Sequence, residues 1–300
     1  MSRASSVAAA VISAACFGTL AVFATLAYSA GALPLQLLTW RFALAGVLLG
    51  AYVIATRPAG LKVTAADLGR YAVMSLLGYG AASMCFFFAL KHTDASIVAI
   101  LLYSYPAMIV VAESLFLGIR PSRTRLSAVA FTFVGCVFVL DPMSAVATVD
   151  GAGVVLGLGA ALGYSVFTIL SHRWIGGRSR LTLMTYLFMF TAALGAVGAL
   201  FTGTSLTIGT WSADVWWLLA AIVLLPTFVA VLLYLRALSG LGAGQAAILS
   251  TVEPIFTIAL AAIVLGERLA TAQWIGAALV VAGVFVAERE GRPAEEIAIV

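Results

Sequence analysis

The sequence predicts an all-α polytopic membrane protein with ten transmembrane helices, arranged as two five-helix repeats of inverted topology. Three observations predict it: an apolar composition, a one-sided distribution of loop charges, and an internal repeat. Hydrophobic residues make up 63% of the 300 residues and charged residues only 9%, and the mean hydropathy is +1.14. A soluble domain carries about 25% charged residues to cover its surface. The composition therefore excludes soluble, disordered, disulfide-stapled and nucleic-acid-binding proteins.

Ten apolar segments follow one another along the chain, separated by short connections that contain Gly, Pro and Arg. A helix needs about 20 apolar residues to cross a bilayer core of about 30 Å. The segments are continuously apolar, whereas strands of a membrane barrel would alternate apolar and polar residues. The expected helices span 7–28, 34–55, 69–90, 95–118, 124–140, 151–171, 181–201, 215–238, 243–265 and 271–288.

Lysine and arginine lie almost entirely on one side of this ten-helix arrangement. Among the 16 Lys and Arg residues, only Lys91 and Arg268 fall in the opposite loops, and Arg41 falls inside the second segment. Loops rich in Lys and Arg face the cytoplasm. We therefore expect a multi-pass protein of the bacterial inner membrane, embedded in the lipid bilayer, with both termini in the cytoplasm. An odd number of helices would scramble this distribution.

An internal repeat becomes visible when the chain is shifted by 148 positions, which aligns 89–120 with 237–268. Pro106 then falls on Pro254, and the Leu-Gly-x-Arg sequence that ends the first stretch falls on the one that ends the second. Because each repeat holds five helices, an odd number, the second repeat must enter the membrane in the opposite sense. Inverted repeats around a site at the midplane are how many secondary transporters achieve alternating access.

The repeat divides the chain into two domains and a tail. We expect a first five-helix repeat at 1–145, a second, inverted repeat at 146–290, and a short cytoplasmic tail at 291–300. A shift of 146 also places Trp40 on Tyr186.

At these residues the chain resembles the EamA-type ten-helix transporters of the drug/metabolite transporter superfamily. The resemblance is carried by Pro254, the Leu-Gly-Glu-Arg sequence at 265–268, and the glycines of the last segment. The first repeat differs, because Ile119 stands where the family commonly has Glu. The resemblance implies a secondary transporter without a cofactor, most similar to bacterial exporters of amino acids, aromatic ones included.

Three charged residues fall inside the apolar segments: Arg41, Glu113 and Glu253. A charge at membrane depth costs about 2.5–3.5 kcal/mol on insertion scales, so each is a functional candidate. Glu253 precedes Pro254 and follows Ser250 by one turn. It either contacts a substrate amine or carries a proton, or it satisfies a kinked backbone and pins two helices. Arg41 suits a substrate carboxylate, or it extends to the interface. Glu113 either has a functional role or is a structural or exposed residue near the outer interface.

Tyrosines near segment centres, beside small residues and the paired prolines, form the second group of candidates. A tyrosine hydroxyl at that depth faces protein or water, which fits a cavity lining or close helix packing. The predicted substrate-binding residues are Tyr79, Tyr103, Tyr164, Trp40, Ser250, Thr251 and Glu253. The predicted coupling or gating residues are Glu253, Pro106, Pro254 and Arg41.

We expect a secondary transporter that exports small organic metabolites, most specifically amino acids, and functions as a monomer. Proton-coupled efflux of cationic drugs or other metabolites through a membrane-embedded carboxylate is the alternative. An intramembrane enzyme would need a cluster of His, Asp or Glu with metal-ligand or general-base spacing, and the sequence has none. A purely structural protein would not need polar residues at the midplane. No metal, cofactor or nucleic acid is expected.

Overall fold

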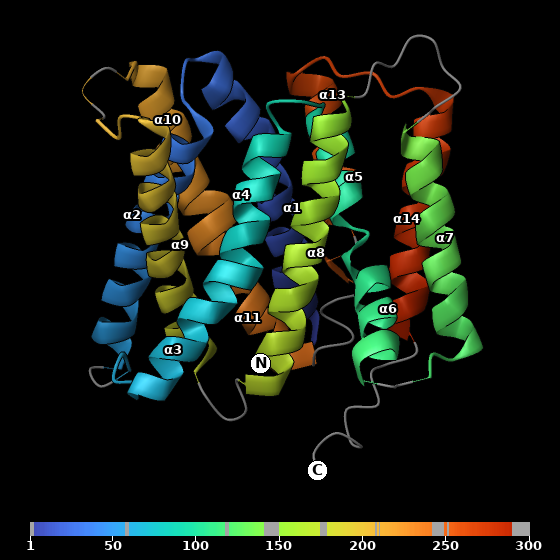
Figure 1. Ribbon diagram of the computed structural model, residues 1–300, viewed down its shortest axis with the longest axis horizontal. Coiled ribbons are helices and arrows are strands. Elements are labelled where there is room, and N and C mark those ends of the chain that lie inside the picture. Colours follow the sequence, from blue (N-terminus) through green and yellow to red (C-terminus); the bar gives the residue numbers. More distant parts are fainter. Residues whose placement is uncertain are drawn as a thin grey trace.

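The computed structural model describes residues 3–57, 60–117, 120–140, 150–174, 179–207, 209, 211–241, 249–250 and 252–289. Every regular element in these ranges is a helix (Figure 1). The elements are α1 (Arg3–Ser29), α2 (Pro34–Thr56), α3 (Ala65–Met74), η1 (Ser75–Tyr79), α4 (Gly80–Ala89), α5 (Ala95–Leu102), α6 (Tyr105–Leu117), α7 (Arg123–Leu140), α8 (Gly151–Trp174), α9 (Arg180–Thr202), α10 (Ala213–Ile222), η2 (Val223–Val229), α11 (Ala230–Leu241), α13 (Glu253–Val264) and α14 (Thr271–Arg289). The predicted all-α class is confirmed.

Long apolar helices account for most of the described chain. Seven of them are long and apolar enough to cross a membrane, and two shorter ones, Glu253–Val264 and Thr271–Val286, are apolar as well. Each described helix lies within a predicted segment or extends beyond the segment's end by only a few residues. The third predicted segment is occupied by α3, η1 and α4 together. The total of ten crossings stays a prediction.

The outer surface of the helices is apolar. Phe201 is 87% exposed, Leu200 82% and Ile263 81%. A water-soluble monomer rarely exposes large contiguous apolar patches. The hydrocarbon core of a bilayer requires an apolar surface of this kind. It also requires that backbone N–H and C=O groups form hydrogen bonds within the protein, as they do in helices. The fold is that of a polytopic helical membrane protein.

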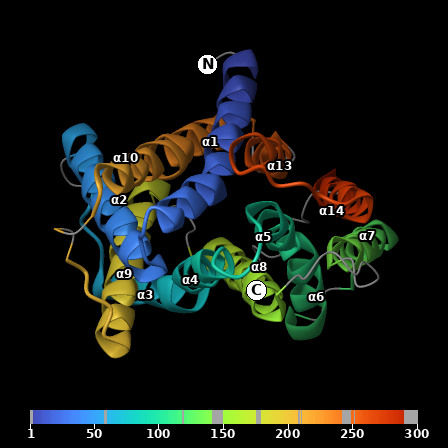
Figure 2. The same cartoon turned by 90° about the horizontal axis from the view of Figure 1, so that it is seen from above.

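The helices pack in pairs that an approximate twofold relation between the repeats explains. The second helix of the first repeat, α2, packs on its counterpart α9, and the fifth, α7, packs on its counterpart α14. The α7–α14 pair stands at one edge of the molecule (Figure 2). Likewise, α1 packs on α11 and α8 packs on α4, so each first helix contacts the third helix of the opposite repeat. The two repeats are thus interlocked.

Both repeats interrupt their third helix with a π-helical turn at the same place. The shift of 148 found in the sequence places Ser75, where η1 begins, on Val223, where η2 begins. In η2 the interruption contains Pro226, which has no backbone N–H to donate. In η1 the turn packs tightly on α8, because a Cβ added at Gly78 would lie 2.9 Å from Phe167 Cα. Such π-bulges frequently occur at functional sites.

The paired prolines break or start helices. The fourth segment is divided, since α5 ends at Leu102 and α6 begins at Tyr105, just before Pro106. In the second repeat α13 begins at Glu253, directly before Pro254. A proline within the first helical turn loses no intrahelical hydrogen bond, which is why each helix restarts there.

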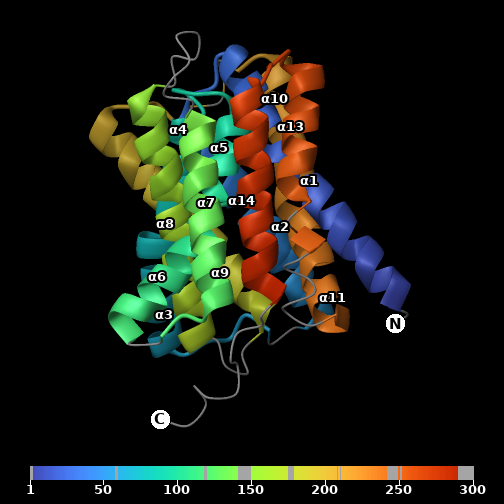
Figure 3. The same ribbon diagram turned by 90° about the vertical axis from the view of Figure 1, so that its right-hand side faces the viewer.

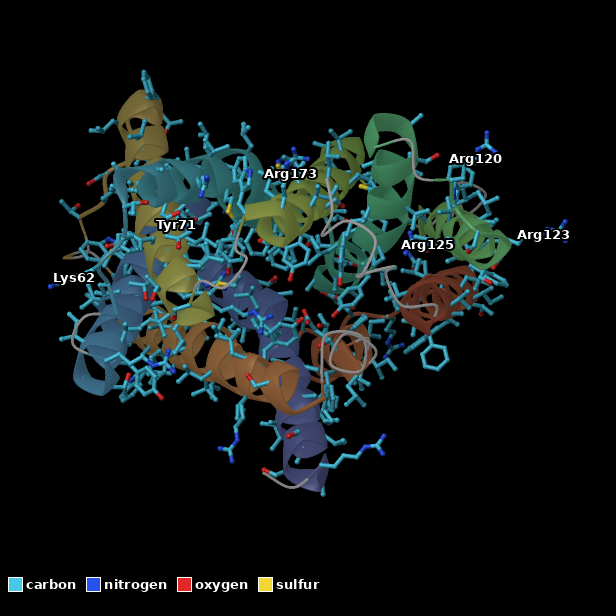
Figure 4. The ribbon with its side chains drawn as sticks, turned by 90° about the horizontal axis from the view of Figure 1, so that it is seen from below. Lys62, Tyr71, Arg120, Arg123, Arg125 and Arg173 are labelled. Carbon is cyan, nitrogen blue, oxygen red and sulfur yellow. The ribbon has the colours of Figure 1, made fainter. Side chains whose placement is uncertain are left out.

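The two ends of the bundle differ in charge. The first residue of α1 and the last residue of α14 lie at the same end (Figure 3). Lys62, Arg120, Arg123 and Arg173 also lie around this end (Figure 4). We call it the basic end, and the other the opposite end. The membrane side that the basic end faces stays a prediction.

Candidate functional site

A cavity of about 330 Å³ lies between the two repeats. Its walls come from α1, α2, η1, α4, α5 and α6 of the first repeat and from α8, α9, α11 and α13 of the second. The polar residues that line it are Arg41, Tyr79, Ser83, Tyr103, Tyr105, Tyr164, Thr168, Ser171, Arg180, Tyr234, Ser250, Glu253 and Thr257.

Arg41 lines the cavity from α2 and is 3% exposed. Its Nε donates a hydrogen bond of 2.8 Å to Thr227 Oγ1 in η2, and Thr227 in turn donates to the Ile222 carbonyl at 2.7 Å. The guanidinium carbon lies 4.5 Å from the centre of the Phe42 ring. Among the described residues no carboxylate is within ion-pair distance of Arg41. A buried, unpaired guanidinium in a cavity wall suits an anionic ligand.

Tyr103 donates to a carbonyl that cannot receive its usual helical hydrogen bond from Pro254. In a continuous helix the Ser250 carbonyl would accept from the backbone nitrogen four residues later, but that residue is proline. Tyr103, buried at the C-terminal end of α5, donates its hydroxyl to the Ser250 carbonyl at 3.0 Å. The proline of one repeat is therefore tied to the tyrosine of the other.

Glu253 lines the cavity beside Tyr103 and is partly exposed. It occupies the first turn of α13, where the helix dipole favours a negative charge. The shift of 148 aligns Glu253 with Tyr105, so the carboxyl group comes from one repeat only. The same holds for Arg41, which the shift of 146 aligns with Leu187. Arg41 and Glu253 thus bring a cation and a carboxyl group to the cavity wall from opposite repeats.

Aromatic rings connect these two charged positions. Tyr105 and Tyr164 meet edge to face with ring centres 4.8 Å apart. Tyr79 meets Phe167 at 5.4 Å, also edge to face. All four rings line the cavity. They form a wall suited to an apolar or aromatic group of a ligand, since aromatic pairs prefer edge-to-face and offset contacts.

The structure brings six of the predicted site residues to the cavity wall and leaves others outside it. Arg41, Tyr79, Tyr103, Tyr164, Ser250 and Glu253 line the cavity. Trp40 does not, because its indole N–H donates to the Leu206 carbonyl at 3.0 Å. Pro106 and Pro254 are buried beside the cavity without lining it. Thr251 and the side chain of Glu113 lie outside the described residues. The roles of these residues in binding and coupling stay predictions.

Sequence reasoning missed several residues of the wall, Arg180 and Ser171 above all. Arg180 begins α9 and lines the cavity, whereas the sequence places it among the loop charges. Ser171 lies near the end of α8 and reads as an ordinary small residue of a helix. Their only signal is position: both flank the loop that joins the sixth and seventh helices.

The cavity extends toward the basic end. Thr168 and Ser171, near the end of α8, line it together with Arg180, the first residue of α9. None of the lining residues comes from the first turn of α5 or the last turn of α13, which lie at the opposite end. Within the part of the chain that the structure describes, the cavity is therefore displaced toward the basic end.

A carboxylate clasps the opposite end. Glu267, after α13, accepts hydrogen bonds from the backbone N–H of Ala95 at 2.9 Å and of Ser96 at 3.1 Å, and from Ser96 Oγ at 2.6 Å. It thus caps α5 of the other repeat, and we call this set of contacts the Glu267 clasp. Burial raises the pKa of Asp94, and the nearby Glu267 carboxylate raises it further.

A second set of cross-repeat bonds obeys the twofold relation closely. On α2, Gln36 Nε2 donates to the Ser205 carbonyl at 2.7 Å, one turn before the Trp40 bond described above. On α9, Thr182 Oγ1 donates to the Gly60 carbonyl at 2.7 Å and the Tyr186 hydroxyl donates to the Leu61 carbonyl at 2.8 Å. These bonds attach α2 and α9 to a loop of the other repeat.

Fold and site together define a membrane protein with a cavity between two interlocked inverted repeats, lined by aromatic, apolar and a few charged side chains. Residues 4–141 and 151–288 each match the EamA-like transporter family. The chain belongs to the EamA-like transporter family, whose members move small molecules across membranes.

Two related proteins are likewise named as transporters. The uncharacterized transporter YwfM of Bacillus subtilis (strain 168) is 28% identical over 222 residues, 70% of this chain and 71% of that protein. The uncharacterized transporter YcbK of the same organism is 29% identical over 285 residues, 89% of this chain and 87% of that protein. A solved structure titled "Crystal structure of protein" superposes with a TM-score of 0.66 at 21% identity, covering 98% of this chain and 100% of that chain, so the fold is shared.

Proposed function

We propose that this transporter is a secondary exporter of amphoteric metabolites, amino acids including aromatic ones, and that it works by alternating access around the cavity. The observation that carries the proposal is the pairing, in one cavity wall, of the Arg41 guanidinium and the Glu253 carboxyl group with aromatic rings between them. Ordinary small-ligand sites occupy about 300–1,000 Å³, and the cavity falls at the lower limit of that range.

Each part of an aromatic amino acid has a matching group. The substrate carboxylate accepts hydrogen bonds from the N–H groups of Arg41 that do not donate to Thr227. The planar guanidinium can present two parallel N–H groups to one carboxylate. The substrate ammonium group faces Glu253. The side chain packs against Tyr79, Tyr164 and their neighbours, where rings meet edge to face.

Alternating access follows from the inverted repeats. The cavity extends toward the basic end, which by its Lys and Arg content is the cytoplasmic end of our proposal. Opening the opposite end requires the Glu267 clasp to break while the basic end closes. A single chain contains both repeats, so we propose a functional monomer in the bacterial inner membrane with cytoplasmic termini.

Counterflow in proteoliposomes tests the proposal. Vesicles are preloaded with unlabelled tryptophan, phenylalanine, threonine or a cationic dye, and uptake of the matching label is measured without any other gradient. We expect uptake with tryptophan and phenylalanine and none with the dye. Uptake with the dye alone would contradict the proposal.

Proton-coupled efflux of cations is a second candidate, favoured by the partly exposed Glu253 in the cavity. In that case a pH gradient drives dye transport by the parent protein, and Glu253→Gln abolishes the dependence on the gradient. If the gradient has no effect on the parent, this candidate fails.

A further inference from the structure

The end of the cavity nearest the basic end contains polar groups that the proposed substrate site does not use. Ser171 lines the cavity, and its Oγ is buried without a hydrogen-bond partner among the described residues. A buried polar group without a partner costs about 1–3 kcal/mol. A hydroxyl left in this state is free to donate to a ligand.

Arg180 lines the same end of the cavity and is exposed there. It is the first residue of α9, a helix of 23 residues whose first turn contains no acidic residue. A cation in the first turn of a helix is unfavourable because the helix dipole is positive there. Within the part of the chain that the structure describes, no carboxylate forms an ion pair with Arg180. Among the described residues, no ion pair thus offsets this unfavourable interaction with the helix dipole.

The third polar group of the region is already occupied. Thr168 donates its hydroxyl to the Tyr164 carbonyl at 2.8 Å. Among the described residues of α8 and α9 that line this end, the Ser171 hydroxyl and the Arg180 guanidinium are therefore the donors available to a ligand. Both are donors, and one is a cation, so they select an oxygen anion over an amine.

We propose that Ser171 and Arg180 form a second subsite, which receives the carboxylate of a substrate at the basic end before that carboxylate reaches Arg41. The inference rests on the proposed function for its substrate class, while the anion site itself rests on the wall residues alone. Two cations then mark the start and the end of the substrate path, with the tyrosine wall between them. The subsite explains how an otherwise apolar cavity attracts a charged solute from water, because a lining charge raises the local concentration of opposite charges.

A thiol reporter beside Arg180 measures this attraction without transport. Met184 lines the cavity one helical turn after Arg180, on the same face of α9. Cys16, Cys85 and Cys136 are first replaced by Ala, and Met184→Cys is then introduced. The purified protein in a zwitterionic detergent reacts with an anionic and with a cationic methanethiosulfonate of similar size. The quantity measured is the ratio of the two rate constants.

We expect Arg180→Gln to lower the anion-to-cation ratio by about fivefold, the scale of one charge acting over several ångströms of water-exposed space. Arg180→Lys restores most of the ratio, which separates loss of charge from loss of fold. The matched control is Arg173→Gln, an exposed arginine near the end of α8 that does not line the cavity. An unchanged ratio in Arg180→Gln, or an equal fall in Arg173→Gln, overturns the subsite.

Protection of the reporter identifies the bound group. Phenylalanine and 3-phenylpropionate, which carry a carboxylate, should slow labelling at Met184→Cys, and phenethylamine, which lacks one, should not. Ser171→Ala should weaken this protection. If added phosphatidylglycerol abolishes the Arg180 effect, a lipid phosphate occupies the site and the substrate subsite is wrong.

The two proposals fail separately. A silent counterflow assay together with an intact Arg180 effect leaves the anion subsite standing and contradicts the amino-acid substrate. Active counterflow of phenylalanine with no Arg180 effect supports the amino-acid substrate and contradicts the anion subsite.

Discussion

The two repeats share a scaffold but not a site. The scaffold bonds follow the twofold relation: Gln36 and Trp40 of α2 bind a loop of the second repeat, as Thr182 and Tyr186 of α9 bind a loop of the first. The charged groups do not follow it, because Arg41 and Glu253 each have an uncharged counterpart. In the proposed mechanism, the symmetric bonds serve the motion between the two access states, and the asymmetric charges serve substrate recognition.

The clasp shows the same contrast between the ends of the molecule. Glu267 accepts three hydrogen bonds from the start of α5 at the opposite end, whereas the aligned residue of the first repeat is Ile119, which has no carboxylate to accept them. In the proposed mechanism, this difference favours a closed opposite end, and with it loading of the cavity from the basic end. Substitutions that make one repeat like the other test this comparison directly.

The largest effect is expected at Arg41. Arg41→Leu gives the first repeat the residue that the second has at Leu187, and it removes the buried cation that α2 contributes to the cavity wall. Hydrogen bonds to a charged group contribute about 1.5–3 kcal/mol, so counterflow of phenylalanine should fall by at least about tenfold. The assay is initial uptake in proteoliposomes at equal reconstituted protein.

Arg41→Lys is the control, since it keeps the charge and loses the planar fork. It should retain part of the activity. Full activity in Arg41→Leu would mean that the carboxylate of the substrate binds elsewhere.

The positions of the helices could be predicted from the sequence, because the length and apolarity of each segment are local properties. The restart of helices at Pro106 and Pro254 was predictable for the same reason, since proline acts on its own turn. The π-turns were not: η1 contains no proline, and its position depends on the approach of Gly78 to α8. Packing between repeats decides such features.

The site was predictable where a residue type alone is unusual at membrane depth, as for Arg41 and Glu253. Trp40 shows the limit, because it directly precedes the wall residue Arg41 on α2, yet its side chain donates to a neighbouring loop instead of lining the cavity. Arg180 shows another limit. A charge at the end of an apolar segment looks like a loop charge whether or not a cavity reaches it.

The clasp gives the second largest effect. Glu267→Ile makes the second repeat match Ile119 and removes three hydrogen bonds from the start of α5. A net loss of about 1–3 kcal/mol shifts the equilibrium between the two access states about tenfold or more toward opening of the opposite end. A cysteine at Ala99, which lines the cavity, reports this state by its labelling with an impermeant maleimide from the outside of cells.

The reciprocal change sharpens the comparison. Ile119→Glu supplies a carboxylate at the aligned position of the first repeat and should shift labelling in the same direction, by favouring closure of the basic end. Reduced outside labelling in Glu267→Ile would contradict the role of the clasp.

Tyr103→Phe should have a moderate effect. It keeps the ring and removes the hydroxyl that satisfies the Ser250 carbonyl, at a cost of about 1–2 kcal/mol. We expect a lower thermal midpoint in detergent and a smaller loss of transport than in Tyr103→Ala. An unchanged midpoint would show that another group satisfies the carbonyl.

The smallest effect concerns pH and Asp94. The closed opposite end holds the pKa of Asp94 above its ordinary value, through burial and the Glu267 carboxylate. The state with the raised pKa binds the proton more tightly, so a fall in pH through that pKa favours the closed end. The titratable groups nearest Asp94 in the sequence are Lys91 and His92, and Arg268 directly follows Glu267.

Asp94→Asn should therefore reduce the change of Ala99→Cys labelling with pH, by about twofold on the scale of a partly exposed charge pair. An identical pH profile in this variant would assign the dependence to another group.

The central claim is that opposite charges in one cavity recognise an amphoteric substrate, and competition of counterflow tests it most directly. Labelled phenylalanine uptake is measured against unlabelled phenylalanine, phenethylamine and 3-phenylpropionate, in the parent protein and in Arg41→Leu. The account predicts that only phenylalanine competes strongly in the parent, and that the advantage of phenylalanine over phenethylamine disappears in the variant. Equal competition by all three compounds in the parent would contradict it.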